Sequence, residues 1–175
     1  IDLLEEKLDR EGDEIAAVIT EATLSNSGLL WPEDGYLDRL RELTREHDVL
    51  FILDEVVTGF RIALGGAQEY FEIEPDIAIY GKSLANGYPC AAVTGREDVM
   101  EFIGTGSDEA TFMGTFSGHP MAVAATKGNL ELLADRDDDA YERLRARGET
   151  LVSGLRDILA DAGYNALVPD FAGFT

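Results

Sequence analysis

Two reactive side chains follow two apolar segments of the sequence. Asp54 comes directly after the apolar run 49–53, and Lys82 comes two residues after the run 77–80. A lysine in such a place is unusual, because burying an ammonium group is costly unless the group is paired or neutral. A neutral amine is the form that attacks a carbonyl carbon, as in Schiff-base chemistry. The pair therefore indicates carbonyl chemistry assisted by a carboxylate, although Lys and Asp also occur at such places as ordinary loop and cap residues.

The segments that must position these side chains alternate between two periodicities. Short apolar runs predict buried strands at 15–19, 49–53, 77–80 and 91–93. Helical spacing of apolar residues predicts helices at 1–10, 36–47, 68–71, 120–133 and 141–162. Strands that alternate with helices in this way predict an α/β domain with a mainly parallel sheet flanked by helices. Reactive groups of such sheets collect beyond the carboxyl ends of the strands, where Asp54 and Lys82 are expected.

The charge of the chain excludes several classes of partner. Its 35 acidic residues outnumber 14 basic ones, which gives a formal charge of −21. Such a field repels nucleic acids and anionic lipids, so neither is an expected partner. The acids are spread over segments with full hydrophobic periodicity, which indicates an acidic surface suited to high salt rather than an acidic tail. The alternative is a merely acidic domain with no adaptation to salt.

The remaining composition argues against metals and membranes. A single cysteine, Cys90, excludes an internal disulfide framework and a multi-cysteine metal site, and we expect no metal. No segment approaches the roughly 20 apolar residues of a membrane span. A reducing, cytoplasmic compartment is the expected location. The chain does not begin with Met and ends on an apolar stretch, so we expect a piece of a longer protein.

Several motifs in the region of these two side chains occur in a fixed order. They are Leu53 to Arg61, Gly65-Gly66 with Gln68, Pro75-Asp76-Ile77, Gly81-Lys82 with Gly87-Tyr88-Pro89, and Gly114 to Pro120. In order and spacing they resemble the signature of the class III pyridoxal-phosphate-dependent aminotransferases. The resemblance implies the large domain of a fold-type I transferase over 1–135 and the start of a small C-terminal α+β domain over 136–175. It also implies a homodimer that shares its sites and acts on small amino donors and acceptors.

The resemblance further implies roles for individual residues. Lys82 would form the internal aldimine with pyridoxal 5'-phosphate and then move the proton between substrate and cofactor. Asp54 would pair with the pyridinium nitrogen, and Val56 would pack on one face of the ring. Gly114 and Thr115 would bind the phosphate of the cofactor that belongs to the other subunit.

Other residues of the motifs receive weaker assignments. Glu21 and Asn26 match a polar loop that lines the site, without a firm role. Val57 stands where much of the family has Gln, so a hydrogen bond from that position to the ring hydroxyl is not available. His119 is expected to shape a helix start, and Cys90 to pack at the start of a strand.

Two branches of the family remain open for the reaction. The segment 54–71 and Asn26 resemble the glutamate-1-semialdehyde aminomutases, which move an amino group within one substrate. The segments 83–88 and 116–120 lean toward ordinary transaminases, which need a separate acceptor. We expect an aminomutase-like aminotransferase. A third possibility is an inactive fragment or a homologue kept for binding, and the intact Lys82 and Asp54 argue against degeneracy.

Overall fold

A four-stranded sheet forms the centre of the molecule. The computed structural model describes residues 1–104, 110–135 and 139–169 of the chain. The sheet has the order β1-β2-β3-β4, with bounds Ala17–Thr20, Leu50–Glu55, Ile77–Tyr80 and Ala92–Gly95. The first three strands are parallel, and β4 runs antiparallel to β3. The predicted mainly parallel sheet is therefore confirmed, and each strand lies within two residues of its predicted range.

Six α-helices accompany the sheet within the described ranges. They are α1 Asp2–Glu11, α2 Tyr36–Glu46, α3 Gly66–Phe71, α4 Glu97–Met100, α5 Pro120–Leu133 and α6 Ala140–Asp161. A small second sheet pairs β5 Ile103–Gly104 with β6 Ala110–Thr111. The sequence did not predict α4, β5 and β6, because segments of two to four residues are too short to show a periodicity. No helix of the described residues is long and apolar enough to cross a membrane.

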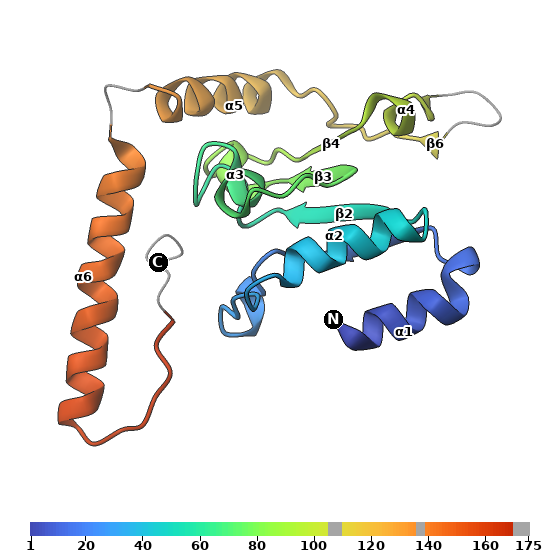
Figure 1. The fold of residues 1–175 in the computed structure, drawn as a ribbon. Coiled ribbons are helices and arrows are strands. Elements are labelled where there is room, and N and C mark those ends of the chain that lie inside the picture. Colours follow the sequence, from blue (N-terminus) through green and yellow to red (C-terminus); the bar gives the residue numbers. More distant parts are fainter. Residues whose placement is uncertain (105–109, 136–138, 170–175) are drawn as a thin grey trace.

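The core lies between α2 and one face of the sheet. Along β2 every second residue is buried, so Phe51, Leu53 and Glu55 point to the same face. Leu37 and Leu40 of α2 pack against this face, together with residues of the loop and helix that follow β2. In Figure 1, α1 and α2 lie together along one side of the strands, and the arrowhead of β2 points toward α6. The carboxyl ends of the three parallel strands therefore face the C-terminal part of the chain.

A buried ion cluster joins α2 to the start of β3. Both oxygens of Asp76, which is 2% exposed, accept hydrogen bonds from Arg41, at 2.7 and 2.9 Å. The Phe51 amide and the Arg96 guanidinium also donate to this carboxylate, each at 2.7 Å. Burial alone would raise the pKa of Asp76. The hydrogen bonds from Arg41 and Phe51 and the charges of Arg41 and Arg96 outweigh burial and hold the pKa below its usual value.

The C-terminal segment is built around α6. This helix stands beside the carboxyl ends of the strands in Figure 1. Within α6 the residues Gly148 and Val152 are buried, and Tyr141 donates a hydrogen bond to the Phe60 carbonyl at 3.2 Å. The predicted domain boundary falls at residues 135–136, next to residues outside the described ranges, and the division into 1–135 and 136–175 stays a prediction.

Candidate active site

The pairing of β2 with β3 places the two predicted reactive residues at neighbouring strand ends. In the parallel register Asp54 lies beside Ile79, and Glu55 lies beside Tyr80. Lys82 follows Tyr80 by two residues, so it begins just past the end of β3. Because side chains alternate along a strand, Asp54 faces away from the core face that Glu55 occupies. The sheet thus brings the carboxylate and the amine to the same edge, as predicted.

Asp54 and Val56 form the β2 part of this edge. The carboxylate Oδ1 of Asp54 accepts a hydrogen bond from the Val56 amide at 2.9 Å, which fixes the side chain at the turn. The second carboxylate oxygen has no partner among the described residues, so it can pair with a protonated ring nitrogen. Val56 lies against Gly81, where an added Cβ would come within 3.4 Å of the valine Cγ1. The apolar side chain therefore sits next to the backbone that leads into Lys82.

Lys82 starts a tight turn after β3. The residue has a φ of 38°, an uncommon value for a residue with a side chain, and it opens the short 3-10 helix Lys82–Leu84. The Asn86 amide donates to the Lys82 carbonyl at 3.0 Å and closes the turn. The lysine side chain is exposed. The preceding apolar strand had indicated that Lys82 is buried. The described residues do not bury it, because the turn directs its side chain out of the sheet.

A side chain distant in sequence holds this turn. Asn129 of α5 donates hydrogen bonds from Nδ2 to the carbonyls of Ser83, at 2.7 Å, and Leu84, at 3.2 Å. These carbonyls belong to the residues that directly follow Lys82. The contact ties α5 to the loop that carries the candidate nucleophile. Sequence reasoning missed Asn129, because nothing in its neighbourhood marks an interaction across 45 residues.

Glu55 organises the loop after β2 and was also missed as a separate group. Its buried carboxylate accepts hydrogen bonds from the Thr58 hydroxyl at 2.9 Å, from the Ala67 amide at 2.6 Å and from Gln68 Nε2 at 2.8 Å. Gly66 has a φ of 66°, and an added Cβ there would lie 2.2 Å from Glu55 Oε2. One hydrogen-bonded loop therefore accounts for the spacing of Glu55, the glycine pair and Gln68 in the sequence.

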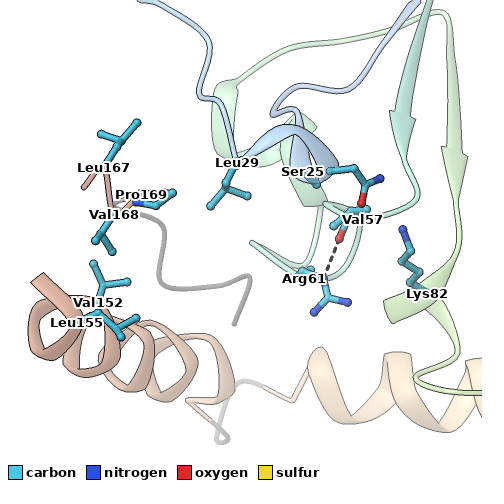
Figure 2. Close-up of a pocket in the computed structure, with 12 residues that line it drawn as sticks. Ser25, Leu29, Val57, Arg61, Lys82, Val152, Leu155, Leu167, Val168 and Pro169 are labelled. Atoms are coloured by element: carbon cyan, nitrogen blue, oxygen red, sulfur yellow. Dashed lines mark hydrogen bonds between the residues drawn. The ribbon is translucent and has the colours of Figure 1, made fainter. Parts of the chain in front are cut away.

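An open cavity of about 620 Å³ lies beside Lys82. Figure 2 shows Ser25, Val57, Arg61 and Lys82 on one side of this cavity and residues of α6 and the C-terminal segment on the other. The residues that line it are Ser25, Asn26, Gly28, Leu29, Val57, Arg61, Lys82, Val152, Leu155, Leu167, Val168 and Pro169. Asn26 and Lys82 thus share one cavity, whereas Asp54 and Val56 lie at the strand edge outside its lining.

The remaining predicted residues are placed as follows. Glu21 does not line this cavity, but its carboxylate accepts a 3.4 Å hydrogen bond from the Ser25 amide within the polar loop. Gly114 and Thr115 are exposed in the segment between β6 and α5 and do not line this cavity, and their role toward another subunit stays a prediction. His119 directly precedes α5, which confirms its place at a helix start. Cys90 is half-buried, two residues before β4. No cluster of potential metal ligands occurs within the described ranges.

Comparison with known proteins assigns the chain to a family. The class III aminotransferase family model matches residues 1–168. The glutamate-1-semialdehyde 2,1-aminomutase of Methanothermobacter thermautotrophicus is 44% identical over 156 residues, which cover 89% of this chain and 36% of the relative. The enzyme of the same name from Haloquadratum walsbyi is 44% identical over 161 residues, covering 91% and 35%. The chain thus spans little more than a third of these curated relatives.

Solved structures agree with the family assignment. An omega-transaminase from Sphaerobacter thermophilus superposes with a TM-score of 0.85 at 28% identity, covering all of this chain and 43% of that one. A β-phenylalanine aminotransferase from Variovorax paradoxus gives a TM-score of 0.78 at 29% identity, covering 93% and 37%. The fold is that of the pyridoxal-phosphate transaminases, and the chain belongs to the class III aminotransferase family.

Proposed function

We propose that the protein transfers amino groups with pyridoxal 5'-phosphate and that Lys82 is the residue that holds the cofactor covalently. The observation that carries the proposal is the placement of Asp54 and Lys82 at the ends of the paired strands β2 and β3. An acceptor for a protonated ring nitrogen and an amine for an aldehyde are the two groups that this cofactor requires of a protein. The family assignment supports the same chemistry.

Each residue of the edge has a separate task in this proposal. Bound pyridoxal phosphate supplies an aldehyde and an electron-withdrawing ring. Asp54 would keep a proton on the ring nitrogen, because its second carboxylate oxygen, which has no partner among the described residues, can accept a charge-assisted hydrogen bond. Val56 would pack on one face of the ring and exclude water from it. The Lys82 amine would remove a proton from the substrate carbon that bears the amino group and deliver it to the cofactor, acting as a general base and then as a general acid.

The proposal also covers the oligomeric state, the substrates and the cellular compartment. We infer a homodimer in which Gly114 and Thr115 of one subunit bind the cofactor phosphate of the other. Their exposure and their absence from the lining of the Lys82 cavity support this inference. Small amino donors and acceptors are the substrates, as the family suggests. A reducing cytoplasm fits a chain with one cysteine.

The covalent assignment is tested on the full-length protein. With pyridoxal phosphate added, borohydride should fix the cofactor to Lys82, and peptide mapping should find the label there. Asp54→Asn should keep the visible absorbance of the bound cofactor. It should lower turnover about a hundredfold, the loss typical when one partner of a developing charge is removed. A label on Lys7 or Lys127 would refute the assignment, and no label at all would favour a homologue kept for binding.

The second candidate function is transfer within a single substrate. Curated relatives at 38–44% identity are named glutamate-1-semialdehyde 2,1-aminomutases, whereas the solved structures at 26–33% identity include transaminases. In favour of the transaminase reaction, the segment 83–88 departs from the aminomutase pattern. A transaminase stalls after one half-reaction unless a keto acid is present. Full-length enzyme is therefore incubated with glutamate-1-semialdehyde and no keto acid, and many turnovers to 5-aminolevulinate would establish the aminomutase.

A further inference from the structure

Arg61 lines the Lys82 cavity and forms no ion pair with any described residue. Arg39, Arg41 and Arg96, by contrast, each contact at least one carboxylate. Arg45, Arg145 and Arg147 have no ion pair among the described residues either, but they are exposed. The chain has 35 acidic residues for 14 basic ones, so an unpaired arginine is not explained by a shortage of acids. Arg61 is also half-buried. Removing a guanidinium from water without a counter-charge costs free energy, and an anionic ligand would offset that cost.

The backbone around Arg61 holds its side chain in place before any ligand arrives. The guanidinium Nε donates to the Val57 carbonyl at 2.9 Å, a hydrogen bond drawn as the dashed line in Figure 2. The Arg61 amide donates to the Thr58 carbonyl at 3.1 Å. The preceding residue, Phe60, packs on the Tyr80 ring with centroids 5.2 Å apart. A side chain fixed in this way loses little conformational entropy when it binds a ligand.

The geometry leaves one edge of the guanidinium available. Because Nε is used by Val57, the two terminal nitrogens remain, and they have no hydrogen-bond partner among the described residues. Two parallel N–H donors match the two oxygens of a carboxylate. Burial lowers the pKa of Arg61 below its usual value, which reflects the same loss of water around the cation.

The cavity contains Lys82 in addition to Arg61, and its wall offers polar and apolar contacts for a small ligand. Lys82 lines the same cavity, and Figure 2 shows its side chain beside that of Arg61. Ser25 and Asn26 add polar groups, and Leu29 and Val57 add apolar surface for a short carbon chain. A molecule that reaches both Arg61 and Lys82 would carry a carboxylate for the guanidinium in addition to the amine that reacts near Lys82.

We propose that Arg61 is the specificity residue for the carboxylate of an amino-acid substrate, bound in the Lys82 cavity through its two terminal nitrogens. The inference rests on the proposed amino-group transfer and narrows its substrates to amines that carry a carboxylate. Simple amines without an acidic group would react less well, because they leave the guanidinium without a counter-charge.

The test uses full-length protein loaded with pyridoxal phosphate and two variants with a control. Arg61→Met removes the charge, Arg61→Lys keeps the charge without the planar fork, and Arg45→Met changes an exposed arginine of α2 outside the cavity. The first readout is calorimetric binding of glutarate, which has no amine and measures the carboxylate site alone. The second is the spectral half-reaction with 4-aminobutanoate and with propylamine, which lacks the carboxylate. A third pair, 5-aminolevulinate and 1-aminobutan-2-one, repeats the comparison.

The expected results separate this inference from the proposed function. Arg61→Met should weaken glutarate binding about tenfold to a hundredfold, because it removes a charge-assisted hydrogen-bonded pair. The preference for amino donors that carry a carboxylate over those that lack one should fall by a similar factor. Arg61→Lys should fall between this variant and the wild type, and Arg45→Met should match the wild type. Equal glutarate affinity in wild type and Arg61→Met, or no glutarate binding by the wild type, would overturn the inference. Failure of borohydride to fix the cofactor would instead refute the proposed function.

Discussion

Two adjacent acidic residues at the end of β2 have opposite surroundings. Asp54 is half-buried at the edge of the sheet, with one oxygen bonded to the backbone of its own turn. Glu55 is fully buried and accepts hydrogen bonds from the backbone and side chains of a loop more than ten residues away. The alternation of side chains along the strand explains the difference, because it sends one carboxylate to the site and the other into the core. Asp54 thus faces the proposed site, whereas Glu55 holds the loop that follows β2.

At the residue scale, Glu55→Gln should destabilise the fold. The amide replaces an oxygen that accepts hydrogen bonds with a donor, so one of the buried donors near Thr58 and Ala67 loses its partner. We expect the free energy of unfolding to fall by about 1–3 kcal/mol, the cost of an unsatisfied buried group. Urea unfolding of the full-length protein measures it. Glu33→Gln removes the same charge from an exposed site and is the matched control. Equal stability of the two variants would contradict the role of Glu55.

At the scale of elements, α5 positions the lysine turn through a single side chain. Asn129→Ala removes the two hydrogen bonds to the Ser83 and Leu84 carbonyls. The free energy of unfolding should fall by about 0.5–1.5 kcal/mol per lost bond, and amide hydrogen exchange should quicken in the turn after Lys82. Asn129→Asp should be worse, because its carboxylate would face two carbonyl oxygens. Lys127→Ala, on an exposed face of the same helix, is the control. Unchanged exchange at Ser83 and Leu84 in Asn129→Ala would show that α5 does not hold the turn.

The ion cluster that joins α2, β2 and β3 should make stability depend on acid. The pKa of Asp76 is depressed in the folded protein, so its contribution is fully present above the unfolded pKa, about 3.9 for aspartate. The contribution is lost as pH falls through the lower folded value. The stability difference between wild type and Asp76→Asn should therefore be constant near neutral pH and shrink below about pH 4. Urea unfolding across this range measures it, with Asp34→Asn at an exposed site as the control. A difference that stays constant in acid would contradict the assignment.

For the whole molecule, the net charge of −21 predicts a response to salt. Self-repulsion of the acidic surface opposes folding, and counter-ions screen it. If the surface is adapted to high salt, the melting temperature of the full-length protein should keep rising up to molar salt. At molar salt the Debye length has already fallen to about 3 Å, so ordinary screening of the surface charge is then complete. Potassium chloride titrations followed by circular dichroism measure the trend. A melting temperature that does not change over this range would contradict the high-salt interpretation and leave the family assignment intact.

Much of the fold could be predicted from the local sequence. The strands at β2 and β3 and the helix α2 follow from the spacing of apolar residues, because periodicity reports directly which side of an element is buried. Asp54 and Lys82 were found for the same reason: each stands next to such an element, and the ends of parallel strands meet at one edge of a sheet. The motifs around them then identified the family without knowledge of the fold.

The tertiary structure alone decided which distant residues meet. Asn129 reaches the lysine turn and Arg41 reaches Asp76 across 35 to 46 residues, and no local pattern specifies such pairs. The exposure of Lys82 depends on the turn after β3. The lack of an acidic partner for Arg61 among the described residues depends on every element around it. Periodicity determines the face that an element buries, but the packing of elements determines which side chains face each other across a loop or a cavity.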